Sequence, residues 1–187
     1  LEELTRLCGA GSVHYRVCDL TDPAAVARTV DEIQAVSGRV DLVLFGAGIS
    51  RSAALERKRL ADFRAVRDVK ALGYAHLRRA FAGRPPLAWC NFGSILGFTG
   101  QPGEIDYTAG NDLLASAAAA GRDDGCQEFT IGWTLWDSIG LAADPVTRGF
   151  LHRSGFSGGM STAEGIALFF GELDRPSAEM TFGHDGL

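Results

Sequence analysis

The chain has 187 residues, of which 46% are hydrophobic and 22% are charged. This composition is typical of one folded globular domain and excludes an intrinsically disordered chain. The formal net charge is −5, and the 18 lysines and arginines are scattered along the chain. A basic stripe that could follow phosphates is therefore absent, and we expect no nucleic-acid partner.

Short apolar runs also exclude a membrane span. The most apolar runs, such as residues 40–45 and 115–120, are far shorter than the roughly 20 residues that a spanning helix requires. No charged and apolar leader opens the chain, and the 4 cysteines form no CxxC pair. We therefore expect a cytoplasmic protein with reduced thiols and no membrane contact.

Helical and extended patterns alternate along the first half of the chain. Leucines at three-residue spacing predict a helix near residues 1–7, and alternating polarity predicts a strand over residues 14–18. A Thr-Asp-Pro sequence is typical of a helix start, and the apolar period after it predicts a helix over residues 21–38. Residues 40–45 are almost wholly apolar, which favours a strand covered on both faces, as in a parallel sheet.

The same alternation continues through the second half. Periodicity predicts helices over residues 60–81, 107–120 and 162–173, and apolar runs predict strands over residues 87–92 and 128–135. Strands separated by helices form right-handed βαβ units. We therefore expect an α/β fold with a Rossmann-type, doubly wound parallel sheet.

One segment near the C-terminus breaks this pattern. Residues 143–159 are rich in Gly, Ser and Pro and are longer than a usual connection. A long segment of this kind favours a functional flap over a cleft.

Ligands of open parallel sheets bind beyond the carboxyl ends of the strands. At these ends, in chain order, lie Asp19, then Gly46, Ala47 and Gly48, then Ser94, and then residues 133–136. Tyr107 follows Ser94 by 13 residues, and Asn111 lies one helical turn further, on the same face of the predicted helix. This spacing indicates a site at the carboxyl edge of the sheet.

A serine hydroxyl, a tyrosine phenol and a lysine suit the reduction of a ketone, because the developing alkoxide needs a proton donor and a hydrogen-bond partner. A tyrosine with its ordinary pKa of about 10 needs a nearby cation to pass through its phenolate form. Lys70 on the preceding helix is the candidate cation, with Val69 and Leu72 marking the core face beside it. Taken alone, Lys70 is equally a solvated lysine, because Arg64 and Arg67 show that this helix carries charge.

With Lys70, Ser94, Tyr107 and Asn111 together, the chain resembles the short-chain dehydrogenase/reductase superfamily, and more narrowly the ketoreductase domains of polyketide synthases. In most of that superfamily a lysine stands four residues after the tyrosine and the asparagine lies on the earlier helix. Ketoreductase domains exchange the two, and this chain does the same with Asn111 and Lys70. The resemblance covers nearly the whole chain and predicts that residues 1–187 form a single ketoreductase-like domain.

The resemblance implies a role for each of the four residues. Tyr107 would donate a proton, Ser94 would hydrogen-bond the substrate carbonyl, and Lys70 and Asn111 would support the tyrosine. The substrate would be an acyl thioester on a carrier protein, and other synthase domains would be neighbours. The implied function is reduction of a β-keto acyl thioester to the β-hydroxy form in polyketide biosynthesis.

The implied cofactor is NADPH. Gly46, Ala47 and Gly48 would let the backbone pass close to its ribose, and Asp19 would lie near its adenine. The family's glycine-rich phosphate loop has no counterpart, so we expect a sheet that lacks its first βαβ unit and a chain that is inactive by itself. Residues 46–48 could instead be that loop, but Arg51 stands where a third glycine belongs.

Two other functions and the stereochemistry stay open. The domain could be a non-catalytic scaffold within a multidomain synthase, or a stand-alone reductase of a small ketone. Residues 50–52 replace the Leu-Asp-Asp signature of one stereochemical class, and no tryptophan precedes Tyr107 as in the other, so product handedness is unassigned. The 4 histidines share no ligand spacing, so we expect no metal site.

Overall fold

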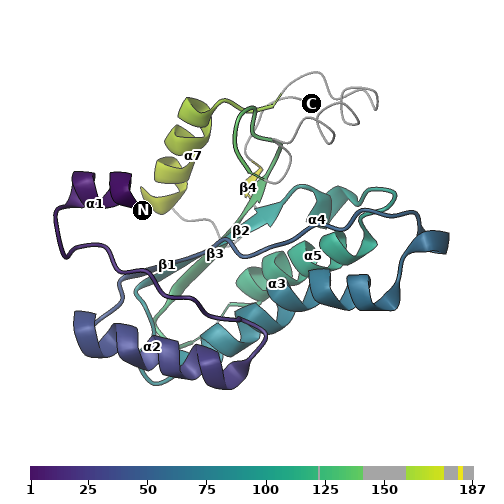
Figure 1. The fold of residues 1–187 in the computed structure, drawn as a ribbon. Helices are drawn as coiled ribbons and strands as arrows, with labels where there is room; N and C mark the ends of the chain where they lie inside the picture. The colour runs from purple at the N-terminus through teal and green to yellow at the C-terminus, as the bar shows by residue number, and fades with distance from the viewer. Residues whose placement is uncertain (122, 141–158, 175–180, 183–187) are drawn as a thin grey trace.

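A parallel sheet runs through the molecule, with helices on both of its faces (Figure 1). The computed structural model describes residues 1–121, 123–140, 159–174 and 181–182. Within these residues the strands are β1 (Leu42–Phe45), β2 (Ala88–Ser94), β3 (Gln127–Trp133) and β4 (Thr181–Phe182), which pair in that order. Every pairing among them is parallel, which confirms the predicted α/β fold with a Rossmann-type sheet.

The connections between the strands are helical, as the alternation predicts. The longer helices are α2 (Pro23–Ser37), α3 (Leu60–Ala80), α5 (Ile105–Ala120) and α7 (Thr162–Asp174), and the short ones are α1 (Glu2–Cys8), η1 (Leu55–Arg57) and α4 (Leu96–Thr99). In Figure 1, α2, α3 and α5 lie along one face of the sheet and α7 lies on the other. Helices on both faces make the sheet doubly wound, as predicted.

Strand side chains alternate between two apolar clusters, one on each face of the sheet. Trp89 packs in the first cluster, where Tyr74 of α3 and Leu114 of α5 are also buried. The next residue, Cys90, packs in the second cluster with the buried Met160 and with side chains of α7. Because both faces are covered, β2 needs apolar residues at successive positions, which explains its apolar run.

The strand predicted over residues 14–18 is wrong. These residues are irregular, and Tyr15 and Val17 are 67% and 86% exposed. Alternating polarity makes a strand only where a partner strand satisfies the backbone, and no strand of the described residues pairs with this segment. The other predicted elements agree with the structure to within two residues at each end.

The predicted core face of α3 is also partly wrong. Val69 is only half-buried and Leu72 is 40% exposed, whereas Val66 and Lys70 belong to the buried stripe. The stripe turns toward α5 because Gly110 of that helix lets the Lys70 stem approach closely. A β-carbon built at Gly110 would lie 3.2 Å from Cβ of Lys70. The lysine is therefore part of the helix interface.

The predicted flap and the membrane prediction can be compared only with the residues that the structure describes. Residues 143–158, which make up almost all of the predicted flap, lie outside them. No helix within the described ranges is long and apolar enough to cross a membrane.

Asp22 caps the N-terminus of α2. Its carboxylate accepts hydrogen bonds from the backbone N–H groups of Ala24 at 2.9 Å and Ala25 at 3.2 Å. We expect Asp22→Ala to lower the free energy of unfolding by about 1 kcal/mol in urea denaturation, because both amides lose their acceptor. Asp22→Asn keeps an acceptor oxygen and is the matched control. Equal losses in the two variants would contradict the capping role.

Candidate active site

Three elements that are distant in the sequence meet beyond the carboxyl end of β2. Ser94 is the last residue of that strand, Tyr107 lies in the first turn of α5, and Lys70 lies in the middle of α3. Parallel strands bring their carboxyl ends to one edge of the sheet, and the helices that follow them begin there. The structure therefore brings together side chains that the sequence separates by up to 37 residues.

The Lys70 amine is buried between α3, β2 and α5. Lys70 is 3% exposed, and its Nζ donates a hydrogen bond to the backbone carbonyl of Phe92 at 3.0 Å. Burial lowers the pKa of Lys70 from 10.5 to about 8, because the ammonium loses its hydration. The alternative that Lys70 is a solvated lysine is therefore wrong.

The Tyr107 phenol interacts with the side chains of Ser94 and Asn111, and its ring lies near the Lys70 amine. Nζ of Lys70 is 5.9 Å from the centroid of the Tyr107 ring. Burial raises the pKa of the phenol, while hydrogen bonds with the side chains of Asn111 and Ser94 act in the opposite direction. The net pKa shift is upward, so the phenol keeps its proton at neutral pH and can donate it.

Ser94 and Asn111 keep hydrogen-bonding capacity that their described partners do not use. The Ser94 Oγ accepts from the backbone N–H of Leu96 at 3.2 Å, its proton is directed to the Tyr107 oxygen, and one lone pair is left for another donor. The Asn111 Nδ2 donates to the backbone carbonyl of Tyr107 at 2.8 Å. Its Oδ1 is buried without a hydrogen-bond partner among the described residues. A buried acceptor of this kind is costly unless a water or a ligand donates to it.

The segment after β1 brings its backbone close to the Lys70 amine. A β-carbon at Gly48 would lie 3.3 Å from Cε and 3.6 Å from Nζ of Lys70, whereas one at Gly46 would meet open space. Ala47 packs against the first apolar cluster and anchors the segment. The Lys70 ammonium has three protons and one described acceptor. Gly48 and Lys70 together therefore fit a group with oxygen acceptors, such as the ribose of a dinucleotide.

Asp19 is not joined to this group by any contact among the described residues. It is exposed, and its carboxylate accepts hydrogen bonds from the hydroxyl and the backbone N–H of Thr21, both at 2.8 Å. These bonds lower the pKa of Asp19. The structure shows a turn former here, and the place of Asp19 near an adenine stays a prediction.

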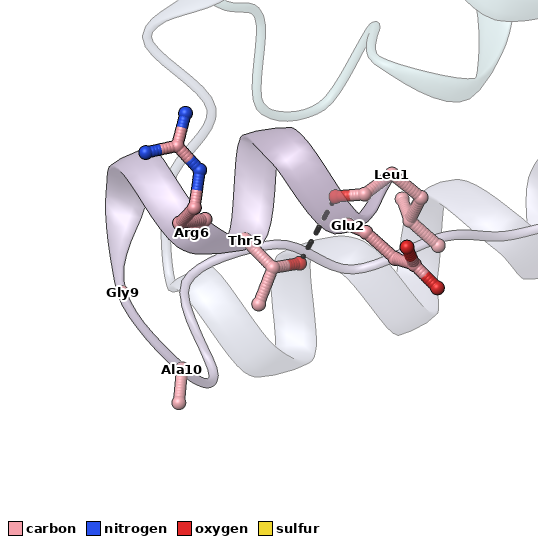
Figure 2. Close-up of a pocket in the computed structure, with 6 residues that line it drawn as sticks. All are labelled: Leu1, Glu2, Thr5, Arg6, Gly9 and Ala10. Carbon is pink, nitrogen blue, oxygen red and sulfur yellow. Dashed lines mark hydrogen bonds between the residues drawn. The ribbon is translucent and has the colours of Figure 1, made fainter.

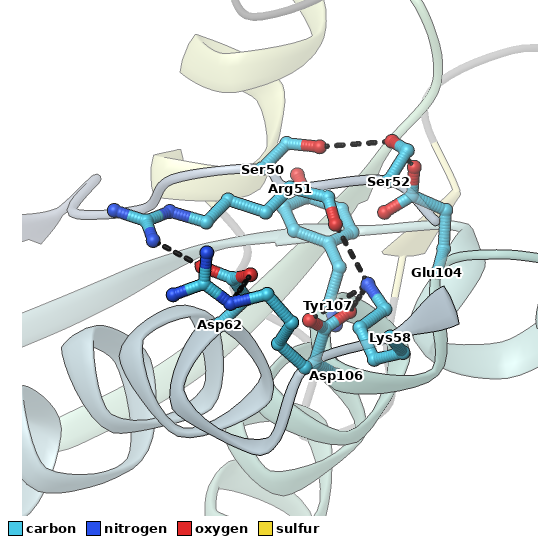
Figure 3. Close-up of polar contacts among 9 residues, drawn as sticks. Ser50, Arg51, Ser52, Lys58, Asp62, Glu104, Asp106 and Tyr107 are labelled. Atoms are coloured by element: carbon cyan, nitrogen blue, oxygen red, sulfur yellow. Dashed lines mark hydrogen bonds and ion pairs between the residues drawn. The ribbon is translucent and has the colours of Figure 1, made fainter. Parts of the chain in front are cut away.

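A charged network that the sequence pattern does not reveal lies beside Tyr107 (Figure 3). Lys58 and Asp106 form a buried ion pair, and the Ser52 hydroxyl donates to the Glu104 carboxylate. Lys58 stands in a run of basic residues, which is typical of solvated chain, and an acidic residue in a first helical turn is typical of dipole compensation. Neither pattern signals burial.

The pocket in Figure 2 lies apart from this site. It is lined by Leu1, Glu2, Thr5, Arg6, Gly9 and Ala10, which belong to α1 and its flanking residues. None of the predicted site residues borders it. Within the part of the chain that the structure describes, no cluster of three or more His, Cys, Asp or Glu side chains could hold a metal ion.

The sequence matches the profile of the family described as KR domain over residues 1–138. It is 36% identical over 178 residues to polyketide synthase ThaG of Burkholderia thailandensis, an alignment that covers 91% of this chain and 3% of that protein. It is 36% identical over 145 residues to erythronolide synthase EryA3 of Saccharopolyspora erythraea, which covers 76% of this chain and 4% of that protein. The chain thus spans a small part of the length of these synthases.

Solved structures share the fold. A ketoreductase domain from the bacillaene assembly line superposes with a TM-score of 0.85 at 24% identity, over 97% of this chain and 45% of that chain. ElxO with NADP bound gives a TM-score of 0.64 at 19% identity, over 97% and 71% of the two chains. A short-chain dehydrogenase/reductase from Burkholderia phymatum in complex with NAD gives 0.72 at 20% identity, over 97% and 74%.

The sequence match and the structural similarity agree. The KR profile covers most of the chain, and the aligned relatives are polyketide synthases. The sheet superposes on short-chain dehydrogenase/reductase folds. The chain therefore belongs to the KR domain family, the short-chain dehydrogenase/reductase-type ketoreductase domains of polyketide synthases.

Proposed function

We propose that this domain reduces the β-keto group of an acyl thioester to a β-hydroxy group with NADPH. The convergence of the Tyr107 phenol with the Ser94 hydroxyl and the buried Lys70 amine carries the proposal. Membership of the KR family supports oxidoreductase chemistry at this place. The thioester substrate is proposed from the multidomain relatives, and NADPH is proposed from the resemblance to ketoreductase domains.

Tyr107 is the proton donor in this proposal. As the carbonyl carbon accepts a hydride, charge develops on the oxygen, and the phenol O–H gives that oxygen its proton. The Ser94 hydroxyl donates a hydrogen bond to the same oxygen and stabilises its charge. Both side chains are held by the carboxyl end of β2 and the first turn of α5, so their positions are set before the substrate binds.

Lys70 supports the phenolate that the transfer leaves behind. A buried phenolate is unfavourable without a nearby cation, and the ammonium lies 5.9 Å from the ring centroid. Asn111 holds the first turn of α5 through its bond to the Tyr107 carbonyl. Its unpartnered Oδ1 is suited to a water that returns the proton to Tyr107.

The cofactor segment in this proposal is Gly46, Ala47 and Gly48, with the Lys70 amine donating to ribose hydroxyls. A bound NADPH supplies the hydride. Asp19 would lie near the adenine. Structures with the same fold hold NADP or NAD, which supports a nicotinamide dinucleotide, while the choice of NADPH rests on the resemblance to ketoreductase domains.

The multidomain relatives support a substrate delivered as a thioester. The chain aligns with 3% of one synthase and 4% of another, so neighbouring domains and a carrier protein are the proposed partners. A stand-alone reductase would act on the free ketone equally well, and a scaffolding domain would not bind the dinucleotide.

Loss of the phenol hydroxyl tests the proton donor. We expect Tyr107→Phe in the full-length protein to lower kcat for reduction of a β-keto thioester by about 100- to 10,000-fold, because no other group replaces the proton. NADPH consumption measures the rate. Tyr15→Phe, at a 67% exposed tyrosine, is the matched control and should leave the rate unchanged. Equal rates in the two variants would remove Tyr107 from the mechanism.

Binding of NADPH separates an enzyme from a scaffold. Because a ligand stabilises the state that it binds, we expect NADPH at 100 times its dissociation constant to stabilise the full-length protein by about 2.7 kcal/mol in thermal unfolding. Tyr107→Phe should show the same stabilisation. No stabilisation of either protein would favour the scaffolding alternative.

The pH dependence of the rate tests Lys70. Its pKa is lowered to about 8, so the ammonium is lost as the pH rises through that value, whereas the raised pKa of Tyr107 keeps the phenol protonated. We expect kcat/KM for NADPH, which reports the free enzyme, to fall above about pH 8. A profile that stays flat to pH 10 would show that the charge on Lys70 is not needed.

We also expect the buried Lys70 ammonium to lower the free energy of unfolding of the protein. The folded protein binds this proton less tightly than the unfolded chain, so the ammonium opposes folding below pH 8, and stability rises between pH 8 and 10.5. We expect Lys70→Met to raise the free energy of unfolding at pH 7 by roughly 1–3 kcal/mol while activity is lost. A destabilised Lys70→Met variant would contradict this account.

A further inference from the structure

A buried ion pair lies next to Tyr107 and takes no part in the chemistry proposed above (Figure 3). The side chains of Lys58 and Asp106 are 3% and 0% exposed, and Nζ of Lys58 lies 2.9 Å from both carboxylate oxygens. The described exposed pairs, such as Arg39 with Asp41 at 69% and 62%, are of a different kind.

Each partner also binds backbone. The Lys58 Nζ donates to the carbonyl oxygen of Arg51 at 2.7 Å, which together with the two carboxylate oxygens occupies its three protons. Oδ1 of Asp106 accepts from the backbone N–H of Tyr107 at 3.0 Å. The pair therefore connects the segment before α3 to the amide of the proposed proton donor.

Two further hydrogen bonds connect the same two segments. The backbone N–H of Ala53 donates to the carbonyl of Gly103 at 3.1 Å, and the Ser52 hydroxyl donates to the Glu104 carboxylate. Residues 51–58, which we call the strap, thus bind residues 103–106 at three places. In the chain the strap follows the Gly46–Gly48 segment, and residues 103–106 precede Tyr107 directly.

Stability alone does not account for a buried ion pair. Removing two charges from water costs about as much as their attraction returns, and a well-packed apolar pair of similar volume is often as stable or more so. An apolar pair, however, forms no directional hydrogen bonds. Hydrogen bonds at 2.7–3.0 Å set the distance and the angle between the two backbones, whereas apolar contact tolerates sliding.

We propose that Lys58 and Asp106 are positioning residues, which fix the first turn of α5 against the strap and thereby hold the Tyr107 phenol at its place beside Ser94 and Lys70. The inference rests on the proposed function for its consequence in catalysis. Its structural content, the coupling of the strap to Tyr107, is independent of what the domain reduces.

The test compares two variants of the full-length protein. We expect the variant with the higher Tm to have the lower kcat. Lys58→Met/Asp106→Leu replaces the pair by apolar side chains, and we expect a Tm close to wild type with kcat lowered about 10- to 100-fold, because the phenol is misplaced. Asp106→Asn keeps the acceptor for the Tyr107 amide but leaves the Lys58 charge buried. It should have the lower Tm and the smaller loss of kcat.

KM for NADPH should stay within about twofold in both variants, because the cofactor segment is not part of the pair. Arg39→Met, in the exposed pair, is the matched control and should change neither Tm nor kcat. A purely structural role predicts that kcat follows Tm across the variants. That result, or wild-type kcat in the apolar double variant, would overturn the proposal.

Amide hydrogen exchange gives a readout that does not depend on activity. In Lys58→Met/Asp106→Leu we expect faster exchange over residues 51–58 and 103–108, with β2 and β3 unchanged. If the wild-type protein reduces no ketone, the proposed function fails while exchange still decides the coupling. Unchanged exchange at residues 103–108 would contradict the positioning role whatever the enzyme assay shows.

Discussion

The proposed site depends on the burial of the Lys70 amine away from water. Lys70 lies on the buried stripe of α3, its amine binds the Phe92 carbonyl of β2, and its aliphatic stem packs against α5 at Gly110. Burial makes the charged ammonium unfavourable, and this lowers the pKa of Lys70. A solvated lysine would have no such shift, and it would have little influence on a phenol because water screens its charge.

Close backbone approaches make this burial sterically possible. A β-carbon at Gly48 or at Gly110 would touch the Lys70 side chain at 3.3 Å or 3.2 Å. At Gly97 in α4 it would lie 2.9 Å from the backbone of Asn111, so α4 also reaches α5 only through a glycine. Glycines in α4, in α5 and in the segment after β1 therefore set how near the polar groups come, and larger residues would separate Lys70, Tyr107 and Asn111.

The polar groups around Tyr107 divide into two sets with different physical roles. Ser94 and Asn111 reach the phenol and retain hydrogen-bonding capacity, which suits groups that face a substrate or a water. Lys58 and Asp106 use their capacity on each other and on backbone, which suits groups that hold a geometry. Ser94 and Asn111 therefore keep free hydrogen-bonding positions, whereas the hydrogen bonds of Lys58 and Asp106 are used within the protein.

The order of the helices and of the strands after residue 40, and the parallel sheet, could be predicted from the sequence, because local periodicity depends only on neighbours along the chain. The spacing of Ser94, Tyr107 and Asn111 placed these residues at one edge of the sheet, and their catalytic roles stay predictions. The absence of a strand at residues 14–18, the burial of Lys70 and the Lys58–Asp106 pair depend on what lies across from each segment in space. Exposure and partnership are properties of packing. Only the tertiary structure decided them, since a lysine in a charged helix looks the same in the sequence whether it meets water or a facing glycine.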